Sequence, residues 1–349
     1  MFMTRTYITL EEMRDIPAEE ISDHDKLPQT PLVSVVLITY NHENFISQAV
    51  ESVIAQQSDF PIELLIGEDC STDHTLELCK KMQKMYPKFI RLFITSENVG
   101  ALRNFLRLVS RAKGKYIAVL EGDDYWINEN KLQKQVGLME SNPDYSWCGA
   151  KTVNRTFWAK EKEYYTLEDI LRRYIFHTSS ILFRSDLLKK FPFIPDMQCV
   201  DFLLTAYLSE QGKCGFLDEE VSYYRRHQGG MWSGANIMCR INTTRQLTDK
   251  MKSYFKGKYK PLLYDRELWI YKMDTAIQLG EGFWQRYRQA LLVVRLVFPR
   301  MMKVLPGQYL LFAMRVLLQP LSFMYLSFRQ KLAIRKRVKA VSVFFRQGL

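Results

Sequence analysis

Acidic and amide side chains follow four short apolar runs in the first part of the chain. They form the segments Thr39–Glu43, Glu68–Asp73, Asn98–Asn104 and Glu121–Asp124. Carboxylates that crowd together repel one another unless a cation lies among them, and oxygen ligands suit Mg²⁺ or Mn²⁺. A divalent ion held by such an acidic pair can bridge phosphate oxygens and stabilise the negative charge of a leaving group. The residue types therefore predict a metal site able to bind a pyrophosphate.

Such a site requires strands that end at one edge of a sheet. The apolar runs have strand length, and they occupy residues 32–38, 62–66, 89–94 and 116–120. Between them we expect helices at residues 45–56, 75–85 and 103–110. Alternating strands and helices with short connections are typical of a mostly parallel, Rossmann-like α/β sheet flanked by helices. In such sheets ligands gather at the carboxyl ends of the strands, where the four polar segments lie.

Each acidic segment also has a purely structural interpretation. Asp69 and Asp73 are residue types that stabilise turns and cap helices, and Glu121–Asp124 would serve as a solvated turn. The order of the segments, one after each successive strand, favours a shared ligand site over unrelated turns.

Seven segments, which cover roughly residues 32–234, resemble the motifs of the family-2 glycosyltransferases with the GT-A fold, in that family's order. These segments are VSVVLITYNHENFISQAVESVIAQ, ELLIGEDCSTDHT, NVGALRNF, LEGDDYW, HTSSILFRSDLL, CVDFLL and LDEEVSYYRRHQGGMWSG. The resemblance implies a GT-A fold, use of Mn²⁺ or Mg²⁺, and a nucleotide-sugar donor, with UDP-sugars the family's common case. It also implies a saccharide or lipid-linked acceptor and a role in cell-surface polysaccharide synthesis.

The resemblance further implies which residues bind the donor. Tyr40 and Asp69 would contact the nucleobase, with Glu43 nearby. Arg103 would lie close to the pyrophosphate, and Asp123 would reach the donor from the metal motif.

Metal binding and catalysis are implied for a second group of residues. Asp123 and Asp124 would serve the metal, and His227 stands where several members place a late metal or phosphate contact. Asp201 stands where the family has its catalytic base, which favours a single displacement with inversion at the sugar. The alternatives are an ordinary loop histidine for His227 and a helix N-cap for Asp201.

The sequence departs from the family's commonest pattern at two positions. Glu121 replaces the first Asp of the metal motif, a change that still leaves a carboxylate able to coordinate. Val200 precedes Asp201 where an acid is common, which weakens the assignment of Asp201 as the base.

The net charge of +11 comes from one end of the chain. Thirteen of the 49 Lys and Arg follow Glu281, the last acidic residue, which leaves 36 against 38 Asp and Glu elsewhere. We therefore expect an acidic lead-in at 1–31, a catalytic domain at 32–234 and a helical basic region at 235–349.

The basic region suggests a membrane partner. Residues 304–328 are strongly apolar but are interrupted by Pro306, Arg315 and Pro320, and basic residues follow at 335–339. This pattern favours helices in the membrane interface beside anionic lipid, and no accompanying motif indicates nucleic-acid binding. The alternative is that the helices pack on the catalytic domain and the charges face water.

Cysteine spacing and the N-terminus indicate the compartment. The six cysteines include no CxxC pair, which favours reduced thiols over a disulfide or zinc framework. Residues 1–30 hold no apolar core of signal-peptide length. We expect a cytoplasmic protein that is peripheral at the cytoplasmic face of the membrane.

Two other function classes fit parts of the pattern. A nucleotidyltransferase would show a Gly-rich basic phosphate loop after the first strand, and Thr39–Glu43 contains neither Gly nor Lys. An inactive, nucleotide-sugar-binding scaffold of the same fold would have no need of intact Asp69, Asp123, Asp124 and Asp201.

Overall fold

The four predicted strands lie side by side and run parallel. Strand β2 (Val33–Thr39) pairs with β3 (Ile62–Glu68) and with β5 (Tyr116–Glu121), and β3 pairs with β4 (Ile90–Ile94). These strands are buried on both faces, as mainly apolar runs predict. The prediction of a parallel unit is confirmed here, and its carboxyl ends carry the four polar segments.

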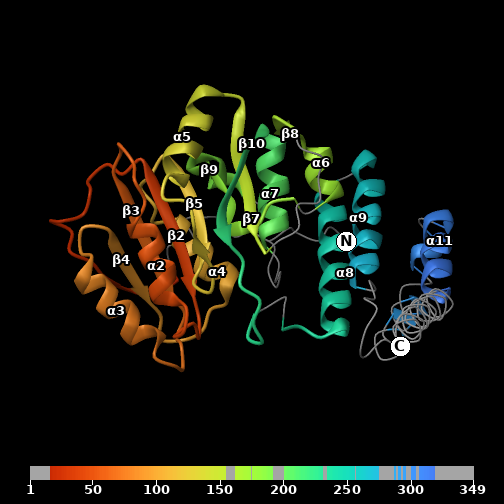
Figure 1. Ribbon diagram of the computed structural model, residues 1–349, viewed down its shortest axis with the longest axis horizontal. Coiled ribbons are helices and arrows are strands. Elements are labelled where there is room, and N and C mark those ends of the chain that lie inside the picture. Colours follow the sequence, from red (N-terminus) through yellow and green to blue (C-terminus); the bar gives the residue numbers. More distant parts are fainter. Residues whose placement is uncertain are drawn as a thin grey trace, which may run out of the picture. The chain divides into compact units, whose positions relative to one another are not determined.

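The computed structural model describes residues 16–154, 162–173, 175–191, 200–230, 234–255 and 257–274, then 287, 290–291, 294–295, 300–303 and 306–318. Within these residues, ten strands form one sheet in the order β1-β4-β3-β2-β5-β9-β7-β10-β6, with β8 paired to β10 (Figure 1). The additional strands are β1 (Glu19–Ile21), β6 (Tyr125–Trp126), β7 (Tyr145–Val153), β8 (Tyr164–Tyr165), β9 (Leu182–Arg184) and β10 (Lys213–Tyr223).

The second half of the sheet mixes directions. Strand β9 is antiparallel to both of its neighbours, β5 and β7, whereas β10 is parallel to β7. Strands β6 and β8 are antiparallel to β10. The sheet is therefore parallel where the polar segments end and mixed beyond β5.

Helices cover both faces of the parallel part. Helices α2 (Ile46–Ile54), α3 (Thr75–Met85) and α5 (Lys131–Ser141) share one apolar core with Leu64 and Ile66 of β3. Helix α4 (Ala101–Val109) packs on the opposite face. Gly67 alternates with Ile66 and so faces the other side of the sheet, where a Cβ at Gly67 would lie 2.1 Å from Asn104 Oδ1. The remaining helical elements of this part are α6 (Leu167–Arg172), η1 (Thr178–Ser180), η2 (Ser185–Lys190) and α7 (Val200–Gln211).

An ion-pair network attaches part of the predicted lead-in to the sheet. Strand β1 pairs with β4, and Arg91 Nε of β4 donates to Glu20 Oε1 at 2.9 Å. The same guanidinium donates to Glu63 Oε2 at 3.0 Å, and Glu63 Oε1 accepts from Ser34 Oγ at 2.6 Å. Residues 19–21 of the segment 1–31 thus form an edge strand, while residues 1–15 lie outside the described residues.

The chain divides into two compact units. The first comprises residues 1–235 and 249–255, and the second comprises 236–248 and 256–349. Helix α8 (Ile237–Tyr254) contributes to both; the second unit adds η3 (Gly257–Tyr259), α9 (Lys260–Asp274) and α11 (Pro306–Leu317). Residues 304–305 and 319–328 of the predicted interface segment at 304–328, and all of the basic cluster at 335–339, lie outside the described residues. No helix in the described parts of the chain combines the length and apolar character that crossing a membrane requires.

Candidate metal and donor site

The first two polar segments are locked together after β2 and β3. Asn41, which has a positive φ of 56°, accepts at Oδ1 from the Thr72 amide at 2.8 Å. Glu43 Oε2 accepts from the His74 amide at 3.0 Å, and the Glu43 amide donates to Asp73 Oδ2 at 3.1 Å. Glu43 and Asp73 therefore fix the N-terminus of α3. Tyr40, the first residue after β2, is exposed.

The fourth segment packs tightly against the first. The Gly122 amide donates to the Ile38 carbonyl at 2.9 Å. A Cβ at Gly122 would lie 2.6 Å from Thr39 Oγ1 and 2.8 Å from His42 Nδ1, so any side chain here would push the two segments apart. Glycine at this position is what allows Asp123 to approach His42.

Asp69 holds the third segment against the sheet. Its buried carboxylate accepts from the Val99 amide at 3.0 Å and from the Gly100 amide at 2.9 Å. Gly100 has a φ of 86°, a conformation that residues with a Cβ rarely adopt. Burial lowers the pKa of the nearby Arg107 guanidinium to about 10, with the charge of Asp69 opposing that shift. Asp69 thus has a structural task in shaping the loop before α4.

Asp123 lies between two histidines. Its Oδ2 is 3.0 Å from His227 Nε2 and 4.0 Å from His42 Nε2. Burial lowers the pKa of His42, and the negative charge of Asp123 opposes that shift. The Asp123 side chain keeps 18% of its exposure, so this carboxylate remains reachable by a ligand from solvent.

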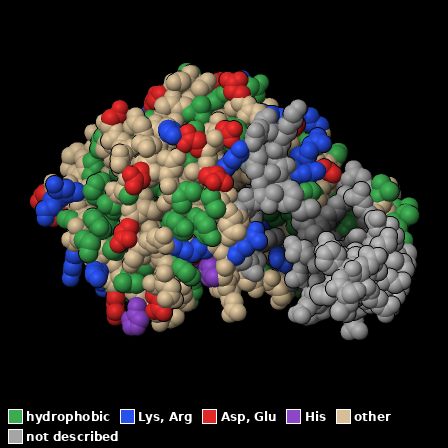
Figure 2. Space-filling model, in the orientation of Figure 1, with side chains coloured by type: hydrophobic (Ala, Val, Ile, Leu, Met, Phe, Trp, Pro, Cys, Tyr) green, Lys and Arg blue, Asp and Glu red, His purple; other side chains and the backbone are tan. Residues whose placement is uncertain are grey.

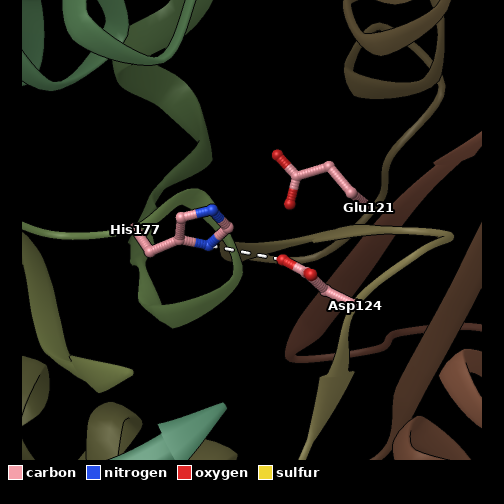
Figure 3. A group of neighbouring side chains, drawn as sticks. All are labelled: Glu121, Asp124 and His177. Atoms are coloured by element: carbon pink, nitrogen blue, oxygen red, sulfur yellow. Dashed lines mark ion pairs between the residues drawn. The ribbon is translucent and has the colours of Figure 1, made fainter. Parts of the chain in front are cut away.

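Asp124 lies in a second group, with Glu121 and His177 (Figure 3). Asp124 Oδ2 is 3.4 Å from His177 Nδ1, and the potential ligand atoms of the three residues all lie within 4.8 Å of one another. Among the described residues, Asp124 Oδ2 and Glu121 Oε2 are buried and have no hydrogen-bond partner. Two such oxygens and an imidazole nitrogen form a donor set that fits a proton or a divalent cation such as Mn²⁺.

The pKa values of both buried carboxyls are raised. Burial, and then the charge of Asp123, raise the pKa of Asp124 to about 8, against hydrogen bonding from the Arg225 amide. Burial raises the pKa of Glu121 well above its ordinary value, and Asp124, Asp123 and Asp201 add to the rise. Without a cation, this group therefore retains protons at neutral pH.

Arg225 connects the late segment to the metal motif. Its amide donates to Asp124 Oδ1 at 2.9 Å, and its Nη1 donates to the Asp123 carbonyl at 2.6 Å. Its guanidinium also hydrogen-bonds Gln48 and lies over the rings of Phe45 and Tyr125. These contacts fix the chain two residues before His227, and so bring that imidazole to Asp123.

The turn that carries His177 is fixed from behind by buried side chains. Trp126 Nε1 donates to the Ser179 carbonyl at 2.8 Å, and Gln135 Nε2 donates to the Ser180 carbonyl at 2.8 Å. Lys131 donates to Gln135 at 2.8 Å and lies over the Trp126 ring. Burial lowers the pKa of Lys131 to about 7.

Comparison with known proteins assigns a family to part of the first unit. The family model described as glycosyl transferase family 2 matches residues 34–198. The chain carries a family-2 glycosyltransferase domain. The matched range contains three strands of the parallel unit in full and all but the first residue of the fourth, together with Asp69, Asp123, Asp124 and His177.

Two relatives illustrate the range of the family. An uncharacterised protein of Mycobacterium tuberculosis is 32% identical over 213 residues, 58% of this chain and 61% of the relative. TuaG of Bacillus subtilis, named provisionally as a teichuronic acid biosynthesis glycosyltransferase, is 37% identical over 120 residues, 34% of this chain and 46% of TuaG. The chain thus spans less than two thirds of the length of either relative.

Solved structures share the GT-A fold at low sequence identity. TarS of S. aureus, solved in complex with UDP-GlcNAc, has a TM-score of 0.52 and 20% identity over 67% of this chain and 71% of that one. The mannosyltransferase PcManGT of Pyrobaculum calidifontis, solved with GDP-Man and Mn²⁺, has a TM-score of 0.56 and 18% identity over 95% of this chain and 92% of that one.

The structure distributes the predicted family-2 residues unevenly. Asp123 and His227 are in contact, and Asp124 adjoins the same group through the backbone. Asp201 lies in the first turn of α7, where its Oδ1 accepts from the Phe202 amide at 2.8 Å, and its charge reaches Glu121. Arg103 is exposed on α4, and among the described residues it has neither a hydrogen bond nor an ion pair that joins it to the cluster.

Three residues of the candidate site were not predicted from the sequence. His42 and His177 lie inside segments that carry the resemblance, but neither imidazole has a local signal of its partner. Arg225 stands two residues before His227, and its contacts with Asp124 Oδ1 and the Asp123 carbonyl were not expected from the sequence. The acidic partners of all three come from Asp123 and Asp124, which lie 53 or more residues away in sequence.

Proposed function

We propose that this chain is an inverting, metal-dependent glycosyltransferase that moves a sugar from a nucleotide-diphosphate sugar to a saccharide or lipid-linked acceptor. The observation that supports it best is the Asp123–His227 pair at the carboxyl end of the parallel strands of a family-2 domain, with Oδ2 and Nε2 3.0 Å apart. Ligands of open α/β sheets bind at this edge.

The metal, Mn²⁺ or Mg²⁺, would be held by Asp123 and His227. An ion that bridges donor phosphates must be reachable, and Asp123 keeps 18% exposure whereas the Asp124 side chain keeps 2%. Asp124 would support the site from behind, because its Oδ1 fixes the Arg225 amide. A bound divalent ion would neutralise the charge that develops on the departing diphosphate.

The donor would lie across the loops that follow β2, β3 and β4. Tyr40 is exposed beside this edge and would stack on a base, while Asp69 and Glu43 hold the loops along the edge. We propose that Arg225 joins Arg103 in neutralising phosphate oxygens. A UDP-sugar is the proposed donor, supported by the UDP-GlcNAc bound to TarS.

Asp201 would act as the general base. In the single displacement, Asp201 takes the proton of the acceptor hydroxyl, whose oxygen forms a bond to the anomeric carbon. The bond from that carbon to the phosphate oxygen breaks, and the nucleoside diphosphate leaves from the opposite face. The contribution of Asp201 to the raised pKa of Glu121 supports its position beside the acidic group.

The cellular setting follows from the relatives and from the charge of the chain. Similarity to TuaG supports a role in cell-surface polysaccharide synthesis. The basic chain after Glu281 supports a cytoplasmic enzyme at the inner membrane surface, where lipid-linked acceptors reside, and no nucleic-acid partner is proposed.

The test is nucleotide release from a panel of UDP-, dTDP- and GDP-sugars with Mn²⁺, Mg²⁺ or EDTA. We expect one donor to be turned over with metal, and Asp201→Asn to lose transfer while it retains donor binding. Asp218→Asn, at an exposed carboxylate paired with Lys151, is the matched control. Product sugar with the donor's own anomeric configuration would exclude inversion. An absence of both turnover and nucleotide binding would overturn the proposal.

A further inference from the structure

Helix α11 presents apolar side chains on two opposite faces. Tyr309, Phe312 and Val316 are buried in the core of the second unit, which also contains Leu268 and Met301. Four further large apolar side chains of the same helix lie exposed, and their exposed fractions range from 51% to 64%: Leu310, Leu311, Met314 and Leu317. Of the two apolar faces, the described residues of the second unit therefore bury one.

The four exposed side chains form one continuous stripe. At about 100° per residue, positions 310, 311, 314 and 317 fall within an arc of about 120°. Single exposed apolar residues are ordinary on protein surfaces, but a contiguous apolar stripe marks an interaction surface. Figure 2 shows hydrophobic side chains at the surface over α11, at the right of the view.

The charge of the surrounding chain indicates what covers this stripe. No acidic residue follows Glu281, whereas thirteen Lys and Arg do. Among the described ones, Arg295 and Lys303 are exposed in the stretch that leads into α11. An apolar helix face next to an excess of positive charge is complementary to an anionic lipid surface, which offers an acyl boundary below negatively charged headgroups.

The length of the helix determines how it would lie. Its 12 residues span about 18 Å, shorter than the roughly 30 Å hydrocarbon core of a bilayer. We propose that α11 lies in the plane of an anionic membrane interface, with Leu310, Leu311, Met314 and Leu317 inserted below the headgroups. The proposal rests on the proposed function in one respect, that the enzyme would meet a lipid-linked acceptor at the membrane surface. Binding to vesicles does not depend on glycosyl transfer.

The test is co-sedimentation of the full-length protein with vesicles of phosphatidylcholine alone or with one third phosphatidylglycerol. We expect binding to the anionic vesicles that weakens with salt, and at least about a tenfold loss of affinity in the double variant Leu311→Ser/Leu317→Ser. Met85→Ser, at an exposed apolar residue of α3, is the matched control and should bind like the unchanged protein.

Several outcomes would overturn the proposal. These are no binding of the unchanged protein, equal binding to both vesicle types, or binding that survives in the double variant. Sedimentation velocity without lipid tests whether a second copy of the chain covers the stripe instead. In that case the unchanged protein would be a dimer and the double variant a monomer. Unfolding curves of each variant show whether the substitution has disturbed the fold. Donor hydrolysis in solution should stay unchanged in the double variant, so failure of vesicle binding and failure of catalysis are separate results.

Discussion

Replacing Asp124 by Asn should change the pH dependence of stability of the metal-free protein in a defined direction. The pKa of Asp124 is raised to about 8 in the folded chain, from an ordinary value of 3.8. Between these two values the folded state binds the proton and the unfolded state does not. The free energy of unfolding must therefore fall as pH rises, by up to about 1.4 kcal/mol per pH unit.

The magnitude follows from the width of that window. From pH 4 to pH 7 the metal-free protein loses up to about 4 kcal/mol through this one carboxyl. Asn has no proton to lose, and its Oδ1 can still accept from the Arg225 amide. The stability of Asp124→Asn relative to the unchanged protein should therefore increase with pH across the same interval.

The assay is urea unfolding in EDTA at pH 4, 5, 6 and 7, followed by the fluorescence of tryptophans that include the buried Trp126 and Trp147. Asp218→Asn, which replaces an exposed carboxylate, should show no comparable trend. A stability difference that stays constant or shrinks from pH 4 to pH 7 would refute the reasoning that burial and the Asp123 charge raise this pKa.

Three further predictions test the groups around the site. Arg225→Gln should lower kcat/KM about 10- to 100-fold in a nucleotide-release assay, because charge-assisted hydrogen bonds to the metal motif are lost. The control Arg226→Gln, at the next residue, should have little effect. Equal losses in the two variants would contradict the role of Arg225. Burial lowers the pKa of Lys131 from 10.5 to about 7. Between these values the unfolded chain binds one more proton than the folded chain, so the free energy of unfolding rises with pH. Lys131→Met should flatten that rise in urea unfolding from pH 7 to 10, and an unchanged slope would contradict the lowered pKa. Arg91→Met removes the ion-pair partner of the buried Glu63 and should cost about 3–5 kcal/mol of unfolding free energy. A loss below about 1 kcal/mol would contradict this prediction.

The parallel unit could be predicted because its signals are local. Each strand is a mainly apolar run, and the boundaries differ from the structure by at most two residues, as at 62–66 against Ile62–Glu68. The helix at 75–85 has the predicted bounds, since its apolar spacing and polar start lie next to each other in sequence.

The mixed half of the sheet and strand β1 depend on distant partners. Strand β10 pairs with β7 across more than sixty residues, and Glu20 finds Arg91 71 residues later. Acidic residues at 19 and 20 look like part of a solvated lead-in until that partner is known. No local pattern in the sequence carries such pairings.

The candidate site was predicted by residue type and only partly by geometry. Resemblance placed Asp123, Asp124 and His227 in one metal group, and the structure joins Asp123 to His227 but turns Asp124 toward Glu121 and His177. Adjacent residues at a strand end point in different directions, so a sequence motif cannot show which of two aspartates faces solvent. The burial of Asp124 separates them here.

The most direct test is the binding of Mn²⁺, measured by the electron paramagnetic resonance signal of the free ion. The proposed site predicts stoichiometric binding that is lost in Asp123→Asn and His227→Asn, weakened in Asp124→Asn, and retained in His177→Gln and the control Asp218→Asn. Binding that persists in Asp123→Asn but disappears in His177→Gln would place the ion in the buried group instead. The absence of Mn²⁺ binding to the unchanged protein, with and without nucleotide, would contradict the metal site altogether.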